Sequence, residues 1–279
     1  MNDVTLPCGT VALAASVYGP AEAPPVLLLH GLGNARDVWF HWAMRLADRY
    51  RVLALDFRGH GHSARAPRYA LTDFVADAEA ALAWLGRPTC VVGHSLGGTV
   101  AGALSVAGHP LAARALLVDP AWYFAEPEEF ARTVYPKRFA MLQGAVERLR
   151  AADTPLAAWM EMIANTPHPR GGTFADVLPQ HQVVSHASAL QRQDPACWSA
   201  TPAEMFGGID VDAPFRVPTT VIQADSALGA ALLDHQAERM QQHNRPAALW
   251  HYMGSDHFPH RTTTFADRFG ADLERFLLG

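Results

Sequence analysis

Short apolar segments alternate along the chain with segments whose apolar residues recur every three or four positions. The first pattern predicts buried β-strands, and the second predicts amphipathic helices. The predicted strands cover residues 11–18, 26–30, 52–56, 89–93, 115–119, 219–224 and 249–253. Strands that alternate with helices are typical of α/β proteins. We therefore expect a mostly parallel central sheet with helices on both faces.

Two of the predicted helices have clear apolar stripes. Thr72 is a plausible N-cap and Gly86 a plausible stop for the first helix, whose stripe consists of Phe74, Val75, Ala78, Leu82 and Leu85. Near the end of the chain, a second stripe predicts a helix that packs on the sheet; its residues are Phe265, Phe269, Leu273 and Phe276.

The alternation stops between about residues 122 and 214, where no convincing parallel strand occurs but segments 126–151 and 155–165 have helical character. An insertion of this length between two core strands is typical of a lid or cap. We therefore expect a core domain of residues 1–121 and 215–279, interrupted by a helical cap over residues 122–214. Most apolar cap residues should form a small core. Trp159 and Trp198 are candidates for the wall of a substrate pocket, together with His94.

Composition narrows the class of protein. Of 279 residues, 49% are hydrophobic and 18% charged, with a formal net charge of −5, which favours a globular protein and argues against nucleic acid or an acidic membrane surface as a partner. The longest apolar runs are too short to cross a bilayer, and the first residues do not resemble a secretory signal. The widely spaced Cys8, Cys90 and Cys197 suit a reducing compartment. We therefore expect a cytoplasmic protein that acts on a small molecule; its oligomeric state stays open.

The segment Gly93-His94-Ser95-Leu96-Gly97 matches the pattern G-x-S-x-G. It follows an apolar, β-branched run and precedes an alanine-rich helical pattern, which is the strand–turn–helix context of a nucleophile elbow. Such a turn exposes the serine hydroxyl above the sheet, beside the N–H groups of a helix N-terminus. Ser95 is therefore the predicted nucleophile.

A serine nucleophile needs a base, and the base needs an orienting acid. His257 follows the last predicted strand and precedes the last helix, so it can reach Ser95 across the carboxyl edge of the sheet. For the acid we favour Asp225, which ends the strand of residues 219–224. Asp119 ends the preceding strand and is the alternative, since the order Ser, Asp, His permits both.

The oxyanion of an acyl-transfer intermediate needs two N–H donors. The backbone N–H of Leu96, the residue after the nucleophile, is the first predicted donor. The second should come from the loop after the strand of residues 26–30, where glycines allow the backbone a close approach to substrate. We choose Leu32 there, and we expect His30 to order the turn.

Together, these segments resemble the α/β-hydrolase fold family: the loop at His30-Gly31, the turn of residues 56–63, the elbow of residues 93–98, and His257. The resemblance covers essentially the whole chain and implies the fold more strongly than the substrate. Family members often place the acid in a G-x-x-D pattern after its strand. Here the corresponding residue is Ala227, and the carboxylate is displaced to Asp225. Either Asp225 still reaches His257, or Asp119 has its role.

The leading hypothesis is a cofactor-free serine hydrolase that cleaves a small, mainly apolar ester, lactone or thioester through an acyl-enzyme. One alternative is a C–C bond hydrolase or lyase on the same triad, since fold does not determine the reaction. A second is a non-catalytic ligand-binding receptor of the same fold, which the displaced acid would favour. No metal site is expected, because His60, His62 and residues 256–260 do not form a dense set with ligand spacing.

Overall fold

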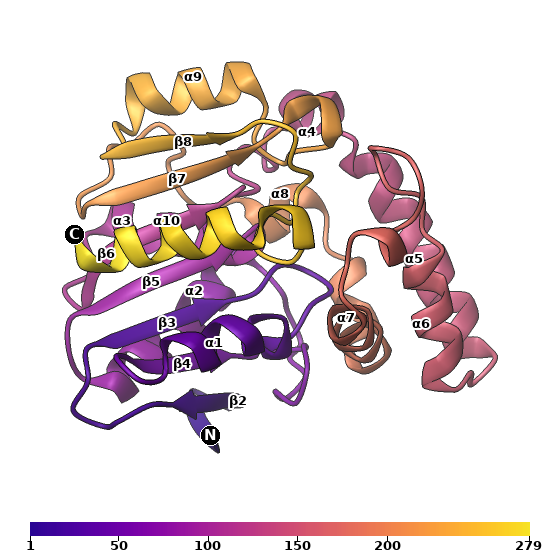
Figure 1. Cartoon of the computed structure of the whole chain (residues 1–279), viewed down its shortest axis with the longest axis horizontal. Helices are drawn as coiled ribbons and strands as arrows, with labels where there is room; N and C mark the ends of the chain where they lie inside the picture. The colour runs from indigo at the N-terminus through magenta and orange to yellow at the C-terminus, as the bar shows by residue number, and fades with distance from the viewer.

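One eight-stranded sheet runs through the molecule in the computed structural model, which describes residues 1–279 (Figure 1). The spatial order of its strands is β1-β2-β4-β3-β5-β6-β7-β8. Their bounds are β1 (Asn2–Cys8), β2 (Val11–Tyr18), β3 (Pro25–Leu29), β4 (Arg51–Leu55), β5 (Thr89–His94), β6 (Ala112–Val118), β7 (Thr219–Ala224) and β8 (Ala248–Tyr252). The seven predicted strands are all present, and the predicted fold class is confirmed.

The strands from β4 to β8 pair in parallel, whereas β1 and β2 are antiparallel to their neighbours. The carboxyl ends of the parallel strands therefore meet along one edge. β1 was not predicted. It is an edge strand that contains Pro7 and buries only Leu6 fully, so it lacks the continuous apolar run that marks the inner strands.

Helices cover both faces of the sheet. On one face, α1 (Phe40–Leu46) and α10 (Ala266–Leu278) share an apolar cluster with β3, β4 and β8. On the other face lie α2 (Leu71–Leu85), α3 (Leu96–Ala107) and α9 (Asp234–His243). Short 3-10 turns connect some elements: η1 (Arg36–Trp39), η2 (Phe174–Asp176), η3 (Pro195–Trp198), η4 (Ser226–Leu228) and η5 (Thr263–Phe265).

The predicted helix ends are partly correct. Gly86 ends α2 in the left-handed conformation, with φ of 67°. The N-cap is Ala70, not Thr72. Alanine has no capping side chain, but the Asp73 carboxylate accepts a hydrogen bond from the Ala70 N–H and stabilises this helix end. In α10, Phe269, Leu273 and Phe276 are buried against the sheet as predicted, whereas Phe265 precedes the helix.

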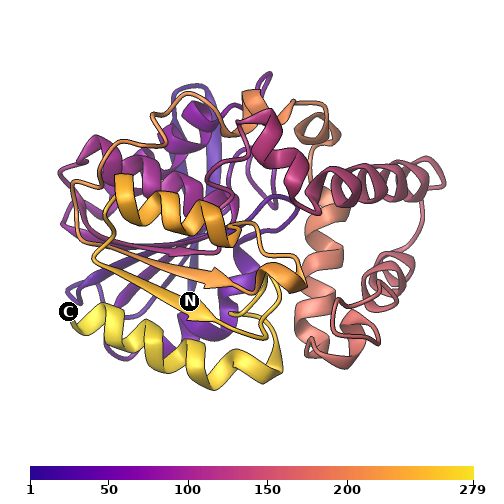
Figure 2. The same cartoon turned by 90° about the horizontal axis from the view of Figure 1, so that it is seen from above.

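Between β6 and β7 the chain forms a helical insertion. It contains α4 (Pro127–Arg132), α5 (Tyr135–Ala151), α6 (Leu156–Ala164), α7 (Gln180–Arg192) and α8 (Pro202–Phe206). The arrows of β7 and β8 point toward it in Figure 2, so the insertion lies at the carboxyl edge of the sheet. α5, α6 and α7 enclose an apolar cluster of their own, which includes Val146, Trp159 and Ile163. No helix of the chain has both the length and the hydropathy to cross a bilayer.

Polar contacts hold α7 and the turn after it against the rest of the protein. Buried Arg261 donates to the Gln182 side chain on α7 and to Asn34. The Gln193 amide contacts His60 over 2.9 Å, and Asp194 accepts a 2.6 Å hydrogen bond from Tyr69. Because most of these groups are buried, the contacts fix where the insertion lies over the sheet edge.

Candidate active site

Ser95 lies in a sharp turn between β5 and α3. Its φ of 53° and ψ of −115° form a backbone conformation that residues other than glycine rarely adopt. The turn depends on two glycines: a Cβ on Gly93 would lie 2.0 Å from the Gly97 carbonyl oxygen, and a Cβ on Gly97 would lie 2.4 Å from that of Leu29. The local sequence therefore builds the predicted elbow, with Ser95 immediately before the helix N-terminus.

His257 follows β8 and contacts a carboxylate from the end of β6. Its Nδ1 lies 2.6 Å from Oδ2 of Asp119, and both side chains are buried. Nδ1–H therefore donates to the carboxylate, which leaves Nε2 as the basic nitrogen of the neutral ring. The structure thus brings together a histidine and an acid that the sequence separates by 138 positions.

The carboxylate of Asp119 is enclosed by donors. Besides His257, it accepts hydrogen bonds from the backbone N–H groups of Ala224, Ala231 and Leu232, at 2.8 to 3.3 Å. Its backbone has a φ of 44°. Four donors occupy the sites that two carboxylate oxygens offer, so Asp119 is held in one orientation toward the imidazole.

The preference for Asp225 over Asp119 as the partner of His257 is wrong in this structure. The Asp225 carboxylate accepts hydrogen bonds from the N–H groups of Ala227 and Gly254. It caps η4 and ties that turn to the loop after β8. Both aspartates end neighbouring strands, but the donors of residues 231 and 232 hold Asp119 beside His257 and those of residues 227 and 254 engage Asp225.

Burial sets the protonation of the pair. It lowers the pKa of His257 to about 3, and the positive charges of Arg138 and Arg261 act in the same direction, whereas Asp256 opposes them. The ring is therefore uncharged near pH 7, as a general base requires. Burial raises the pKa of Asp119, while its three backbone donors favour the ionised form.

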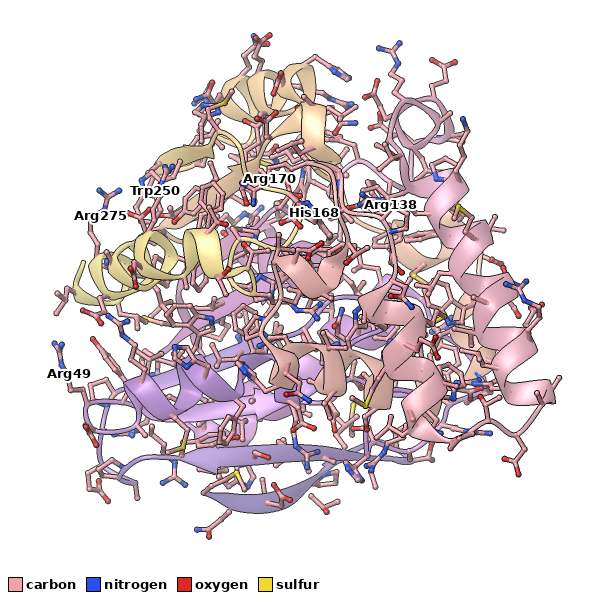
Figure 3. All side chains as sticks on the ribbon, turned by 45° about the vertical axis from the view of Figure 1, so that its right-hand side comes forward. Arg49, Arg138, His168, Arg170, Trp250 and Arg275 are labelled. Atoms are coloured by element: carbon pink, nitrogen blue, oxygen red, sulfur yellow. The ribbon has the colours of Figure 1, made fainter.

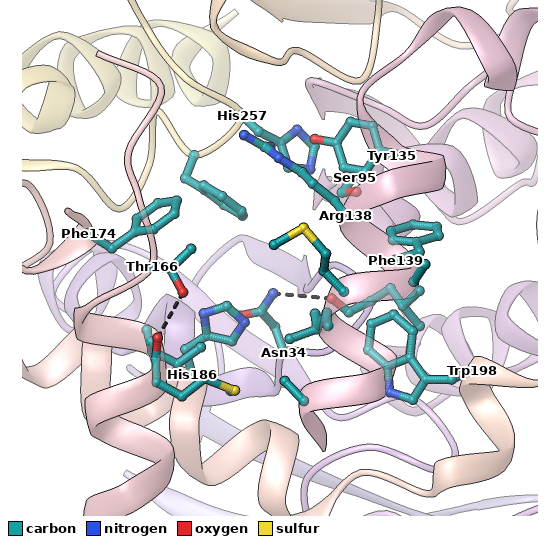
Figure 4. A pocket seen from close by; sticks show the side chains of 18 of the residues that line it. Asn34, Ser95, Tyr135, Arg138, Phe139, Thr166, Phe174, His186, Trp198 and His257 are labelled. Carbon is teal, nitrogen blue, oxygen red and sulfur yellow. Dashed lines mark hydrogen bonds between the residues drawn. The ribbon is translucent and has the colours of Figure 1, made fainter. Parts of the chain in front are cut away.

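Ser95 and His257 line the same cavity, which has a volume of about 480 Å³. Figure 4 shows both side chains at one end of it, together with Tyr135 and Arg138 from α5. The opposite walls come mainly from the insertion and are apolar, with Phe139, Met162, Ile163, Phe174 and Trp198 among them. The cavity has the size and the mixed lining of a small-molecule site.

The two predicted oxyanion donors are free to act. The Leu32 N–H donates no hydrogen bond within the protein, and Leu96 is the first residue of α3, where the N–H has no intrahelical partner. The Leu32 loop lies directly against Ser95, because a Cβ on Gly31 would lie 3.1 Å from the Ser95 Cβ. An alanine at position 31 would therefore crowd the serine.

His94 has a supporting position. Its ring lines the cavity and lies 4.5 Å from the ring of His257, centroid to centroid. Nε2 of His94 lies 2.9 Å from the carbonyl oxygen of His257 and donates to it, which holds the backbone of His257 in place. Burial lowers the pKa of His94 well below its usual value, so this ring is neutral as well.

Only one of the two tryptophans that were predicted to line the pocket does so. Trp198 lines the cavity. Trp159 does not line it, contrary to the prediction: it is 1% exposed and packs inside the cluster of α5, α6 and α7. Sequence reasoning missed Tyr135 and Arg138. In the sequence, their only mark is that Arg138 follows Tyr135 by one helical turn at the start of α5.

His30, which we expected to order its turn, and Asp56 both shape loops through hydrogen bonds. His30 uses Nδ1–H on the Gly31 carbonyl and accepts at Nε2 from the Phe57 N–H, which orders the loop that carries Leu32. The Asp56 carboxylate accepts from the N–H groups of Arg36 and His62 and so shapes the turn of residues 56–63. No three His, Cys, Asp or Glu side chains are grouped in a way that could hold a metal ion.

Comparison with known proteins identifies the family of this chain. The sequence profile of the alpha/beta hydrolase family matches residues 26–269. A serine hydrolase-like protein of Danio rerio is 32% identical over 124 residues, which cover 42% of this chain and 37% of that protein. A pimeloyl-[acyl-carrier protein] methyl ester esterase of Methylococcus capsulatus is 37% identical over 107 residues, which cover 38% and 41% of the two chains.

A solved structure is similar over the whole chain. The enol-lactonase from Burkholderia xenovorans superposes with a TM-score of 0.71 at 22% identity and covers 99% of this chain and 100% of its own. At that identity the likeness concerns the fold. The matched region spans less than half the length of both curated relatives described above. Because the family profile covers most of the sequence, the chain belongs to the alpha/beta hydrolase family.

Proposed function

We propose that this protein is a serine hydrolase that cleaves a small ester, lactone or thioester through an acyl-enzyme. The observation that carries the proposal is the buried contact of 2.6 Å between Nδ1 of His257 and the carboxylate of Asp119. It leaves Nε2 of a neutral imidazole available in the cavity that Ser95 also lines. A nucleophile and a base on one cavity, with a buried acid that orients the base, are the components of acyl transfer.

The proposed reaction starts with attack of the Ser95 hydroxyl oxygen on the substrate carbonyl carbon. Nε2 of His257 takes the hydroxyl proton, and Asp119 stabilises the imidazolium that results. The imidazolium then returns the proton to the leaving group, which departs as an alcohol or thiol. Water, deprotonated by the same nitrogen, attacks the acyl-enzyme and releases the acid.

The oxyanion of both steps would lie between the backbone N–H groups of Leu32 and Leu96. Neither group has a partner in the protein that it would have to give up. Each preorganised donor of this kind contributes about 3 kcal/mol to stabilising the transition state. The position of Gly31 against Ser95 supports this role, because it brings the Leu32 loop next to the attacking atom.

The size and the apolar walls of the cavity support a small, partly apolar substrate. Two of the similar proteins are named for the same bond type, one as a methyl ester esterase and one as an enol-lactonase. The receptor hypothesis rested on a displaced acid. The contact of Asp119 with His257 removes that reason, and hydrolysis is the stronger proposal.

Replacement of Ser95 tests the proposal. With a panel of short aryl esters, we expect Ser95→Ala to lose at least about 10⁴-fold in kcat, since the remaining groups cannot form an acyl-enzyme. Ser199→Ala is the matched control, because Ser199 is exposed and does not line the cavity. A fluorophosphonate should label the wild-type protein at Ser95 only, as read by mass spectrometry.

Full esterase activity in folded Ser95→Ala protein would reject the proposal. Absence of both turnover and labelling in the folded wild type would reject it too and return the receptor hypothesis. A vinylogous 1,5-diketone belongs in the panel: its cleavage at C–C, with esters untouched, would replace ester hydrolysis by the C–C reaction on the same residues.

A further inference from the structure

The arginine and carboxylate content of the cavity lining is unbalanced in favour of positive charge. Three arginines line it, Arg138, Arg148 and Arg261, and no aspartate or glutamate does. The chain as a whole is acidic, with 27 acidic and 22 basic residues apart from histidine. The positive lining is therefore a local property of this cavity. Guanidinium groups without carboxylate partners beside apolar walls are unfavourable, unless an anion joins them there.

Arg138 is the arginine nearest to the proposed chemistry. Figure 4 shows it at the Ser95 and His257 end of the cavity, and its charge acts on both His257 and Asp119. The guanidinium lies 5.7 Å from the centre of the Tyr135 ring, and Nη2 would be 3.1 Å from a Cβ on Gly229. The side chain is thus held against one wall with its fork beside the reacting groups.

No carboxylate of the protein satisfies Arg138. None of the ion pairs in the structure includes it, whereas eight other arginines have acidic partners. The charge of Arg138 acts on the buried Asp119, but the oxygens of this carboxylate already accept from His257 and three backbone N–H groups. The buried Asp256 is engaged by His168 and the Phe258 N–H.

The other two arginines have different positions. Arg261 is 4% exposed and its donors contact Gln182 and Asn34, so it holds the insertion to the core. Arg148 is exposed on α5. Arg138 is half-buried, and in Figure 3 it falls inside the outline of the molecule, whereas Arg49 and Arg275 project from it. Arg138 is therefore half-buried, has no acidic partner and lies at the same end of the cavity as Ser95.

We infer that the cavity takes a substrate that carries a carboxylate, which Arg138 binds within a few atoms of the carbonyl that Ser95 attacks. The expected substrate class is the half-ester, or another acyl derivative, of a short dicarboxylic acid. A guanidinium binds a carboxylate through two parallel hydrogen bonds, which fixes direction as well as charge. The apolar walls then hold the carbon chain between the two ends. This inference rests on the proposed function.

A pair of substrates tests it. The 4-nitrophenyl monoester of glutaric acid and 4-nitrophenyl pentanoate share the leaving group and the acyl chain length but differ in the terminal charge. The wild-type protein should prefer the monoester in kcat/KM by at least about 10-fold, as expected for one charge-assisted contact. Arg138→Met should reduce this preference by about 10- to 100-fold and change the rate on the pentanoate far less.

Lys137→Met is the matched control. Lys137 is the preceding residue of α5, is exposed, and loses the same charge upon substitution, so its preference should stay within about 2-fold of the wild type. Arg138→Lys keeps the charge without the fork and should retain an intermediate preference. If Arg138→Met does not fold, the lysine variant carries the test. Equal rates of the wild type on the two esters, or an unchanged preference in the Arg138 variants, would overturn the inference.

Binding of glutarate separates this inference from the proposed function. Glutarate should bind to Ser95→Ala protein in calorimetry, and the additional change Arg138→Met should abolish this binding. Binding that depends on Arg138 in a protein that cleaves no ester would keep the anion site and reject the hydrolase. Ester cleavage without a charge preference and without glutarate binding would keep the hydrolase and reject the anion site.

Discussion

The two sides of the cavity are built in different ways. The core side consists of loops at the carboxyl ends of strands, and its polar groups hold one another: Asp119 has four donors, and His94 fixes the backbone of His257. The insertion side is formed mainly by apolar side chains of α5 and α6, with few polar contacts among them. Directional bonds keep atoms in place, whereas apolar packing tolerates changes of shape. We therefore assign the reaction to the core side and the choice of substrate to the insertion side.

The largest effect should come from the acid on the core side. Asp119→Asn should lower kcat by about 10³- to 10⁴-fold, because an amide cannot stabilise the imidazolium and favours the wrong tautomer of His257. Asp225→Asn is the matched control and should stay within about 3-fold of wild-type kcat, since its carboxylate only caps η4 and the loop after β8. Steady-state kinetics on one aryl ester measures both. A larger loss in the Asp225 variant would invert the assignment.

A smaller effect is expected from the loop beside the nucleophile. Gly31→Ala should lower kcat by about 10²-fold, because the new Cβ would lie 2.9 Å from Nδ1 of His94 and 3.1 Å from the Ser95 Cβ, which displaces the serine and the Leu32 donor. Gly9→Ala is a control in open space on the far turn between β1 and β2. It has a positive φ, so it should reduce thermal stability and leave kcat unchanged.

The smallest predicted effect is a shift in the pH dependence, caused by a charge on the insertion side that acts on groups of the core side. Arg138 on the insertion side lowers the pKa of both His257 and Asp119. Removal of this positive charge in Arg138→Met makes protonation of the pair easier. The acid limb of kcat/KM for a neutral ester should therefore move to higher pH, as measured from pH 4 to 8. A limb that stays in place, or moves to lower pH, would show that this charge does not act on the base.

The parts of the proposed site that depend on a local pattern could be predicted from the sequence. Ser95 and the Leu96 N–H follow from one short motif, and His257 follows from its place after the last strand. The Leu32 donor depends on a glycine loop directly after a strand. In each case a few neighbouring residues determine the backbone, so the relevant geometry is present in the local sequence.

The choice between Asp119 and Asp225 as the partner of His257 could not be predicted from a local pattern. Each ends a strand, each precedes a turn, and their roles differ only because distant backbone N–H groups surround one of them and not the other. Trp159 and Trp198 present the same difficulty, since both are large apolar residues of one insertion. Their packing depends on how α5, α6 and α7 meet, which no local pattern reveals.

The backbone conformation of the site has a consequence for how this protein can change. Only four residues other than glycine have a positive φ, and two of them are Ser95 and Asp119. Such conformations are unfavourable by about 1–3 kcal/mol each, less for an aspartate. Glycine at either position would relieve this strain and make the fold more robust, but would remove the reactive or the orienting group. Selection for thermal stability alone would therefore favour loss of these two side chains. A relative with glycine at both positions would have a more stable fold and no catalytic activity.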